Sequence, residues 1–356
     1  MEIGIGLDQT AQLSYQEHHE AIRAAIRFGY TSAWTPAGFG PDAFQTCAQW
    51  AGAAGSITDE RTEARTFQTG ISVVPVPLWT VPSLASVAAT VGALTESRFS
   101  LGIGTGSITS PEYRASLNLP AYPPIALMRD YLVTLRGLIA GEHVEYSGQT
   151  VTLHGVVLPW PGTRPHVPLL LGALGPQMLR LAGEAADGAA LNWCTPEQIA
   201  WSRERMTEGA QRAGRDPGAL RLVEYIRVCV DEDEDVARRA FTGAILGYAL
   251  ARPGQTKTQG YRAHFARMGF DDALTDLEAR RDNGAPQDEL IDAFLQDLLR
   301  LVGYYGPAAG ADAAFRRLAV GLDTALVRIV PARPGLASVL ATIAACAPQT
   351  TGSTTT

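Results

Sequence analysis

Short apolar segments alternate along the chain with longer segments in which apolar residues recur at helical spacing. The apolar segments lie at residues 2–7, 32–35, 69–74, 98–103, 167–171, 188–191, 220–230 and 325–330. The helical segments follow them at residues 15–28, 42–54, 82–95, 124–140, 176–186, 195–214, 232–250 and 335–346. Apolar strands that alternate with helices are typical of a parallel sheet covered on both faces. Eight such units favour an α/β fold of the closed (β/α)8 TIM-barrel type over an open doubly wound sheet.

Two insertions interrupt this alternation. Residues 142–160, after strand four and its helix, have the pattern of a hairpin that turns at Ser147-Gly148. Residues 251–322, before strand eight, have the pattern of a long loop with helices. We expect one barrel domain over residues 1–349, with a substrate pocket shaped by both insertions. The small polar residues 350–356 predict a disordered tail.

Composition and charge narrow the class of protein. The chain has 356 residues, of which 46% are hydrophobic and 18% charged, which indicates a globular protein with a large core. A net charge of −7 argues against binding to a nucleic-acid backbone. Neither a signal peptide nor an apolar run of the roughly 18 residues that a membrane span needs is present. We therefore expect a cytoplasmic protein, a homodimer, that binds no membrane, and the widely scattered cysteines predict no metal site.

Glycine-rich turns follow the fourth and fifth predicted strands, at Gly104-Thr105-Gly106 and at Gly172-Ala173-Leu174-Gly175-Pro176. In a TIM barrel the active site lies at the carboxyl ends of the strands, so both turns would lie at its edge. Glycine exposes backbone N–H groups to a phosphate, and Pro176 opens a helix whose dipole favours an anion. A tight turn that simply needs glycine explains either turn alone, whereas two turns on one face favour a phosphate site. The glycines at 102–106 do not match the dinucleotide-binding fingerprint, because no helix begins directly after them.

Several blocks of the chain resemble the bacterial-luciferase-like superfamily. They are WTPAGFGPD at 34–42, TGISVVP at 69–75, RFSLGIGTGS at 98–107 and PLLLGALGPQMLRLAGEAADGAALN at 168–192. Within this superfamily they are most similar to the branch that uses the deazaflavin coenzyme F420. The likeness extends through the last strand (LDTALVRIVPARPG) and is loose only in residues 251–322.

The resemblance implies an oxidoreductase that transfers a hydride between C5 of coenzyme F420 and a small organic substrate. It also implies a non-prolyl cis peptide in a bulge on strand three that supports the deazaflavin ring. The residues that would bind the coenzyme are Gly70, Ile71 and Ser72 at the bulge, Gly104, Thr105 and Gly106 along its tail, Gly172, Ala173, Leu174, Gly175 and Pro176 at its phosphate, and Asn192 at its edge.

The sequence departs from the family pattern at the end of strand two. Many deazaflavin-dependent members carry an acidic residue or an Asp-His pair where this chain has Ala37 and Gly38. The group that exchanges a proton must then come from elsewhere. Asp8, at the end of strand one, is the first candidate, although it could equally cap the turn Asp8-Gln9-Thr10.

Aromatic side chains at strand ends are candidates for substrate contact. Trp34, Phe39 and Trp193, together with Trp79, could form a stacking wall, or could belong to the core. The alternative function is an FMN-dependent luciferase-like monooxygenase that uses reduced flavin and O2. Such an enzyme would favour a cationic residue at the phosphate turn. The turn after strand four has Thr105 rather than arginine, which favours the deazaflavin. A relative that has lost its activity is the third possibility.

Overall fold

The computed structural model describes residues 1–56, 66–106 and 110–348. Within them, eight parallel strands pair in one closed ring, in which the last strand returns to the first. They are β1 (Glu2–Gly6), β2 (Ser32–Thr35), β3 (Gln68–Pro75), β4 (Phe99–Gly104), β7 (Leu169–Gly172), β8 (Gly188–Asn192), β9 (Arg221–Val230) and β11 (Thr324–Ile329). The predicted TIM barrel is therefore confirmed, and the predicted tail lies outside the described residues.

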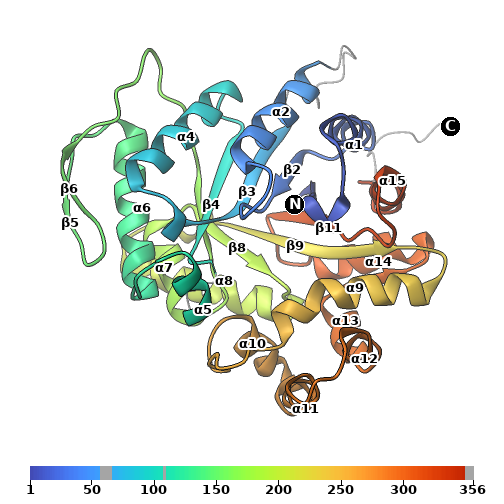
Figure 1. Cartoon of the computed structure of the whole chain (residues 1–356). Helices are drawn as coiled ribbons and strands as arrows, with labels where there is room; N and C mark the ends of the chain where they lie inside the picture. The colour runs from blue at the N-terminus through green and yellow to red at the C-terminus, as the bar shows by residue number, and fades with distance from the viewer. Residues whose placement is uncertain (57–65, 107–109, 349–356) are drawn as a thin grey trace.

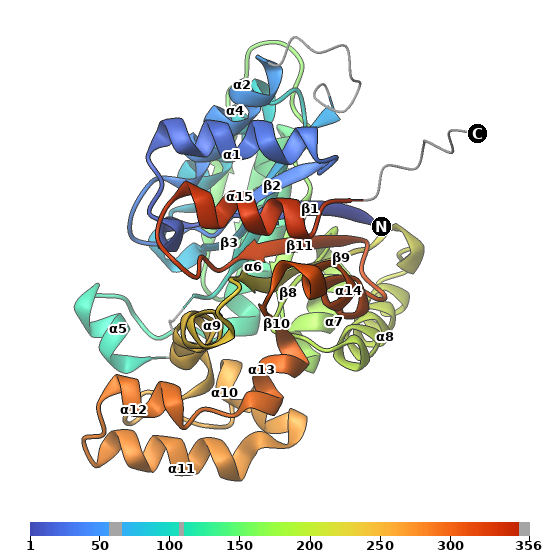
Figure 2. The same cartoon turned by 90° about the vertical axis from the view of Figure 1, so that its right-hand side faces the viewer.

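Helices surround the barrel on its outside (Figures 1 and 2). They are α1 (Tyr15–Arg27), α2 (Ala43–Gly55), α4 (Val81–Leu94), α6 (Pro124–Ala140), α7 (Pro176–Ala185), α8 (Pro196–Arg212), α14 (Ala308–Leu318) and α15 (Leu336–Ala345). A short helix, α5 (Pro111–Ser116), follows β4. Helix α1 begins with a capping box between Ser14 and Glu17, and α6 ends at Gly141, whose φ of 86° favours glycine. None of the helices among these residues is long and apolar enough to cross a membrane.

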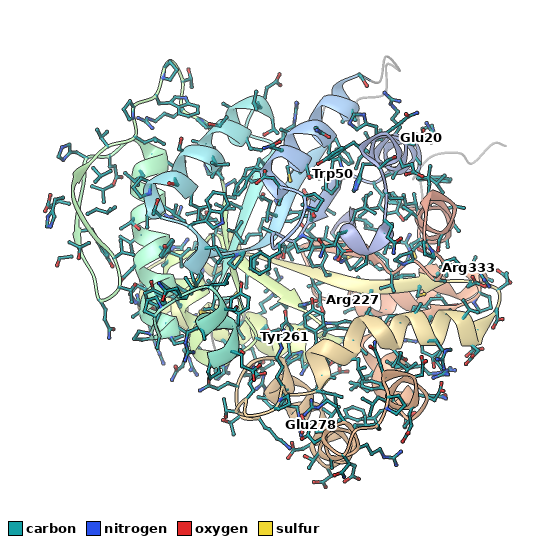
Figure 3. All side chains as sticks on the ribbon, in the orientation of Figure 1. Glu20, Trp50, Arg227, Tyr261, Glu278 and Arg333 are labelled. Carbon is teal, nitrogen blue, oxygen red and sulfur yellow. The ribbon has the colours of Figure 1, made fainter. Side chains whose placement is uncertain are left out.

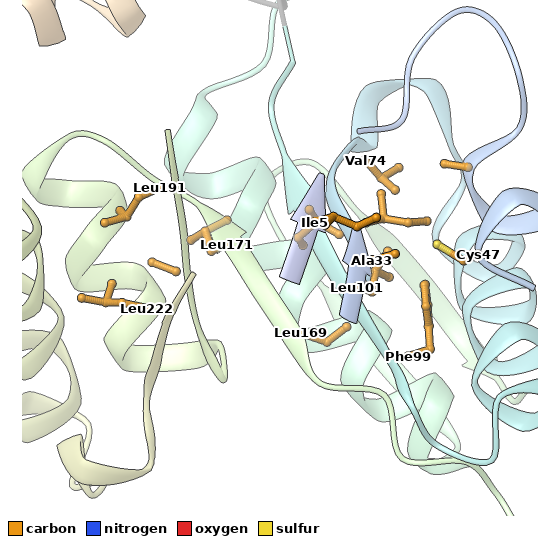
Figure 4. Packing of buried hydrophobic residues seen from close by; sticks show 14 of the residues in the cluster. Ile5, Ala33, Cys47, Val74, Phe99, Leu101, Leu169, Leu171, Leu191 and Leu222 are labelled. Carbon is orange, nitrogen blue, oxygen red and sulfur yellow. The ribbon is translucent and has the colours of Figure 1, made fainter. Parts of the chain in front are cut away.

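The largest apolar core lies between the strands and the helices. Ile5, Leu101 and Leu171 point outward from β1, β4 and β7 and are fully buried (Figure 4). Cys47 of α2 belongs to the same cluster. Burial of side chains on the outer face of the strands explains why the strands contain apolar residues at both alternating positions.

The interior of the barrel combines a few large side chains with glycine. Trp34 of β2 is 3% exposed, and its indole Nε1 donates to Ser32 Oγ at 3.0 Å. A Cβ atom on Gly70 of the neighbouring strand would lie 2.3 Å from the Trp34 ring. The indole therefore fits only because residue 70 has no side chain.

The first insertion forms the predicted hairpin, with strands β5 (Val144–Ser147) and β6 (Thr152–Val156). It packs against the outside of α6, at the periphery of the molecule (Figure 1). Because the hairpin packs on α6, its expected part in shaping the substrate pocket stays a prediction.

The second insertion begins after α9 (Glu234–Ala249) and forms helices α10 (Gly260–Phe265), α11 (Asp271–Asp282), α12 (Gln287–Asp292) and α13 (Gln296–Val302). It packs around an apolar cluster that includes Trp193, Phe241, Phe265 and Leu298. The sequence analysis missed a short strand, β10 (Gly303–Gly306), which pairs in parallel with the end of β9. Figure 2 shows α10–α13 on the side of the barrel away from α1.

One buried carboxylate joins β8 to β9. Glu224 is 1% exposed, and its Oε1 accepts a hydrogen bond from the backbone N of Cys194 at 2.6 Å. Its Oε2 is buried and has no partner among the described residues. Burial raises the pKa of Glu224 to about 8, against the opposing effects of the Cys194 hydrogen bond and the Arg227 charge.

The Asp130 carboxylate anchors the hairpin, and replacing it should destabilise the protein. Asp130 lies on α6, is 3% exposed, and accepts hydrogen bonds from Tyr146 Oη (2.7 Å), Thr150 N (2.6 Å) and Val151 N (3.1 Å). Burial raises the pKa of Asp130, but these hydrogen bonds outweigh it and hold the pKa below its usual range. Asp130→Asn places an NH2 group among donors, so we expect a loss of about 1–3 kcal/mol in urea unfolding. Glu145→Gln, at an exposed position of the same hairpin, is the control, and equal stability of the two variants would contradict this anchor.

The Glu224 carboxyl should make stability depend on pH. Because its folded pKa is raised, the folded protein retains a proton that the unfolded chain loses, so wild-type stability falls as pH rises from about 4.5 toward about 8. Glu224→Gln keeps the acceptor for Cys194 but does not titrate. Relative to wild type, we expect the variant to gain ~1.4 kcal/mol for each pH unit in this window, measured by chemical unfolding. The control is Glu204→Gln, at an exposed position of α8, whose free energy of unfolding should vary with pH as that of the wild type does. If the free energy of unfolding of Glu224→Gln also ran parallel to wild type, Glu224 would be ionised in the folded protein.

Candidate active site

Charged and polar side chains gather at the carboxyl ends of the barrel strands. Arg227 of β9 lies directly opposite Arg328 of β11, which in turn lies opposite Gly6 of β1. A Cβ atom on Gly6 would approach the Tyr225 ring to 2.8 Å and Arg328 Cδ to 2.9 Å. Glycine in β1 therefore leaves the space that the Arg328 and Tyr225 side chains occupy inside the barrel.

Arg227 is a buried cation that has no carboxylate at ion-pair distance among the residues described. It is 5% exposed, and its Nη1 donates to Asn192 Oδ1. Its guanidinium carbon lies 3.7 Å from the centre of the Trp193 ring and 5.3 Å from that of Tyr248. Burial lowers the pKa of Arg227, and the ring of Trp193 partly replaces the lost hydration.

Helix α10 of the second insertion fixes the ends of β7 and β8. Asn192 Nδ2 donates to Tyr261 Oη at 2.7 Å, and His264 Nε2 donates to the Trp193 carbonyl at 2.9 Å. Just beyond α10, Arg267 Nη2 donates to the Leu174 carbonyl at 3.0 Å. Figure 3 shows Tyr261 and Arg227 on the side of the barrel that faces the insertion.

A buried ion pair holds α10 in place. Arg262 Nε donates to Glu278 Oε1 on α11 at 2.8 Å, and both side chains are 3% exposed. The same Glu278 oxygen accepts from the Ala251 backbone N at 2.8 Å, and Lys257 Nζ lies 2.6 Å from the other oxygen. Since charges at this depth need partners, this pair ties α10, α11 and the segment after α9 together.

Asp8 lies where either role that the sequence left open is possible: it caps the turn after β1, and it also faces the barrel mouth. Its Oδ1 accepts from the backbone N of Thr10 at 2.8 Å, so it caps the turn after β1. Its Oδ2 accepts from Arg328 Nη2, so it also faces the barrel mouth. The Arg328 guanidinium lies 4.9 Å from the centre of the Tyr225 ring. Arg328 Nη1 and Tyr225 Oη are buried and have no partner in the described part of the chain.

The glycine turns after β4 and β7 lie side by side around a bulge in β3. The register of β3 shifts between Ile71 and Val74. Cβ atoms on Gly104 and Gly172 would lie 2.6 Å and 3.2 Å from the side chain of Val73. A Cβ on Gly106 would lie 2.8 Å from Pro75, and the φ of Gly106 is 61°. Close packing therefore requires glycine in this region, independently of any ligand.

A non-prolyl cis peptide lies in the β3 bulge, between Ser72 and Val73. The sequence analysis placed a bond of this kind within Gly70-Ile71-Ser72. The cis bond therefore lies in the expected strand, one residue beyond the expected segment.

The turn after β7 ends at an open helix terminus. Gly175 precedes α7 with an ordinary φ of −105°, Pro176 is the first helical residue, and no side chain among the residues described caps the helix. A Cβ on Gly175 would have no neighbour within 4 Å. The first-turn amides are therefore available to an anion. Ala173 is not, because its N–H already donates to the Ala190 carbonyl at 3.2 Å, which corrects the expected role of this amide.

Trp34, Phe39 and Trp193 do not come together in one wall. Trp34 lies in the barrel core, Trp193 is fully buried in the insertion cluster, and Phe39 is 62% exposed beside Tyr113. Trp193 is buried because of its backbone, which has a φ of 60° and places the ring against Phe241. Its ring supports Arg227 and offers no surface to a ligand.

Sequence reasoning missed Arg227, Arg328 and Tyr261. The first two were visible as arginines at inward positions of apolar strands, in LVEYIRVCV and TALVRIV. Tyr261 had no such signal, because the insertion alone brings it to the mouth. Among the residues described, no group of three or more His, Cys, Asp or Glu side chains could hold a metal ion.

Comparisons with known proteins identify the family. Residues 2–308 match the luciferase-like monooxygenase family. A 5,10-methylenetetrahydromethanopterin reductase of Archaeoglobus fulgidus is 29% identical over 238 residues, which cover 65% of this chain and 70% of that protein. An F420-dependent glucose-6-phosphate dehydrogenase of Mycolicibacterium gilvum is 26% identical over 184 residues, 48% of this chain and 52% of that protein.

Solved structures of both cofactor types share the fold. The coenzyme F420-dependent tetrahydromethanopterin reductase of Methanopyrus kandleri superposes with a TM-score of 0.75 at 19% identity, covering 98% of each chain. A type II Baeyer-Villiger monooxygenase component of Pseudomonas putida, in complex with FMN, gives 0.59 at 17% identity and the same coverage of both chains. The match over most of the sequence, together with this barrel, shows that the chain belongs to the luciferase-like monooxygenase family.

Proposed function

We propose that the protein is a coenzyme F420-dependent oxidoreductase that transfers a hydride between the deazaflavin C5 and a small organic substrate. The observation that carries this proposal is the uncapped terminus of α7 beside the glycine turn of β4, at the open end of the barrel. Several relatives are F420-dependent enzymes by name, which supports the deazaflavin over FMN.

The residues at the mouth fit such a coenzyme. The amides of Gly175 and the first turn of α7 would bind its phosphate, and Arg267, which contacts Leu174, would add a positive charge. Thr105 and Gly106 would border its tail. The β3 bulge, at Gly70, Ile71 and Ser72, would support the ring, and Asn192 would lie at its edge. When bound, the coenzyme supplies the hydride.

Proton exchange with the substrate requires a side chain at the same mouth. Asp8 remains our first candidate, and Arg328 orients its carboxylate. Tyr261 is the second candidate, because its oxygen accepts from Asn192 and its hydroxyl donates to no acceptor in the described part of the chain. Burial raises the pKa of Tyr261, so the phenol stays protonated and can donate.

An FMN-dependent monooxygenase is the second candidate function. Arg267 is compatible with it, because a flavin phosphate would attract a cation beside the turn after β7. Arg267 accompanies either phosphate, however, and so does not separate the two cofactors by itself.

The Gly175→Val substitution tests the phosphate site. Because Gly175 has an ordinary φ and open space beyond its Cα, valine fits the fold but places two methyl groups beside the first-turn amides. Loss of one charge-assisted hydrogen bond corresponds to about 1.5–3 kcal/mol, so coenzyme F420 should bind about 10- to 100-fold more weakly in a fluorescence titration.

Gly52→Val is the matched control, because Gly52 lies on α2 and also has no neighbour within 4 Å of its missing Cβ. It should leave coenzyme binding unchanged. Wild-type affinity in a Gly175→Val protein with an unchanged melting temperature would rule out a phosphate at α7.

A further inference from the structure

Two guanidinium groups face each other across neighbouring strands at the barrel mouth. Arg227 and Arg328 are in register on β9 and β11, and each is 5% exposed. Asp8 balances the charge of Arg328, whereas no carboxylate in the described ranges lies at ion-pair distance from Arg227. The two arginines and Asp8 together therefore carry one net positive charge.

The other acid near Arg227 does not balance this charge. Glu224 lies three residues before Arg227 and contacts the Cys194 backbone N. Burial raises the pKa of Glu224 to about 8, so it is largely neutral at pH 7. The partners of Arg227 that remain are the neutral Asn192 amide and the rings of Trp193 and Tyr248.

Unpartnered donors lie beside this charge. Arg328 Nη1 and Tyr225 Oη are both buried, and neither has a hydrogen-bond partner among the described residues. Tyr225 is 4% exposed and lies under the Arg328 guanidinium. Buried donors in proteins are nearly always paired, so two orphaned donors beside an unbalanced cation indicate an acceptor that comes from outside the chain.

We propose that Arg227, Arg328 and Tyr225 form a binding site for a carboxylate group of the substrate. This inference rests on the proposed function only in taking the bound ligand to be the substrate of the enzyme. A guanidinium matches a planar carboxylate through parallel N–H donors, and one net positive charge matches a monoanion better than a phosphate dianion. The side chain of Arg227 then selects the substrate by its charge, and the second insertion holds it there through Asn192 and Trp193.

Binding of small probes to the F420-saturated protein tests this site. The probes are benzoate and propionate, each compared with its uncharged amide, and inorganic phosphate, all measured by ligand-observed NMR. We expect at least one carboxylate to bind ten-fold or more tightly than its amide and more tightly than phosphate. Arg227→Gln should lower carboxylate affinity at least ten-fold and leave the amides unaffected.

Arg221→Gln is the matched control, because Arg221 lies at the other end of β9 and pairs with Glu2 at a half-exposed position. It should bind the probes like wild type. Arg227→Lys keeps the positive charge but lacks the parallel N–H donors of the guanidinium, so it should retain part of the carboxylate affinity. It replaces Arg227→Gln in the test if the glutamine variant does not fold.

Three results would overturn the carboxylate site. They are equal binding of carboxylates and amides, tighter binding of phosphate than of either carboxylate, and an Arg227→Gln protein that loses affinity for coenzyme F420 but not for the carboxylates. If wild type failed to bind coenzyme F420 while the unloaded protein still bound carboxylates as expected, the proposed function alone would fail.

Discussion

Arg227 is buried with no carboxylate at ion-pair distance among the described residues, and the barrel mouth depends on this constraint. Removing a guanidinium from water is costly, and the chain compensates with neutral groups only. Trp193 and Tyr248 provide ring faces, and Asn192 provides one acceptor. A carboxylate in their place would neutralise the cation, so the neutral surroundings leave the positive charge available to a ligand.

The second insertion maintains this arrangement. Tyr261 holds the Asn192 amide, and His264 holds the Trp193 carbonyl in a backbone conformation that tryptophan rarely adopts. The Arg262–Glu278 pair anchors α10 behind them. Tyr261 and His264, far from Asn192 and Trp193 in the sequence, thereby fix two of the residues that contact Arg227. This links the apolar cluster of the insertion to the chemistry of the mouth.

The barrel architecture could be predicted from sequence because burial on both faces imposes continuous apolar runs, and the hairpin because its turn is local. Strand β10 was missed because the four residues GYYG have no pattern of their own and form a strand only by pairing with β9. The site was harder to predict. Trp193 and Ala173 lie at the expected strand ends. The positive φ of Trp193 accompanies the burial of its ring, and the Ala173 amide already donates to the Ala190 carbonyl.

The most direct test of the account is the relative affinity of wild-type protein for the two cofactors, measured by equilibrium dialysis of coenzyme F420 and of FMN under the same conditions. We expect coenzyme F420 to bind at least ten-fold more tightly than FMN. Tighter binding of FMN would contradict it and would assign the open terminus of α7 to a flavin phosphate.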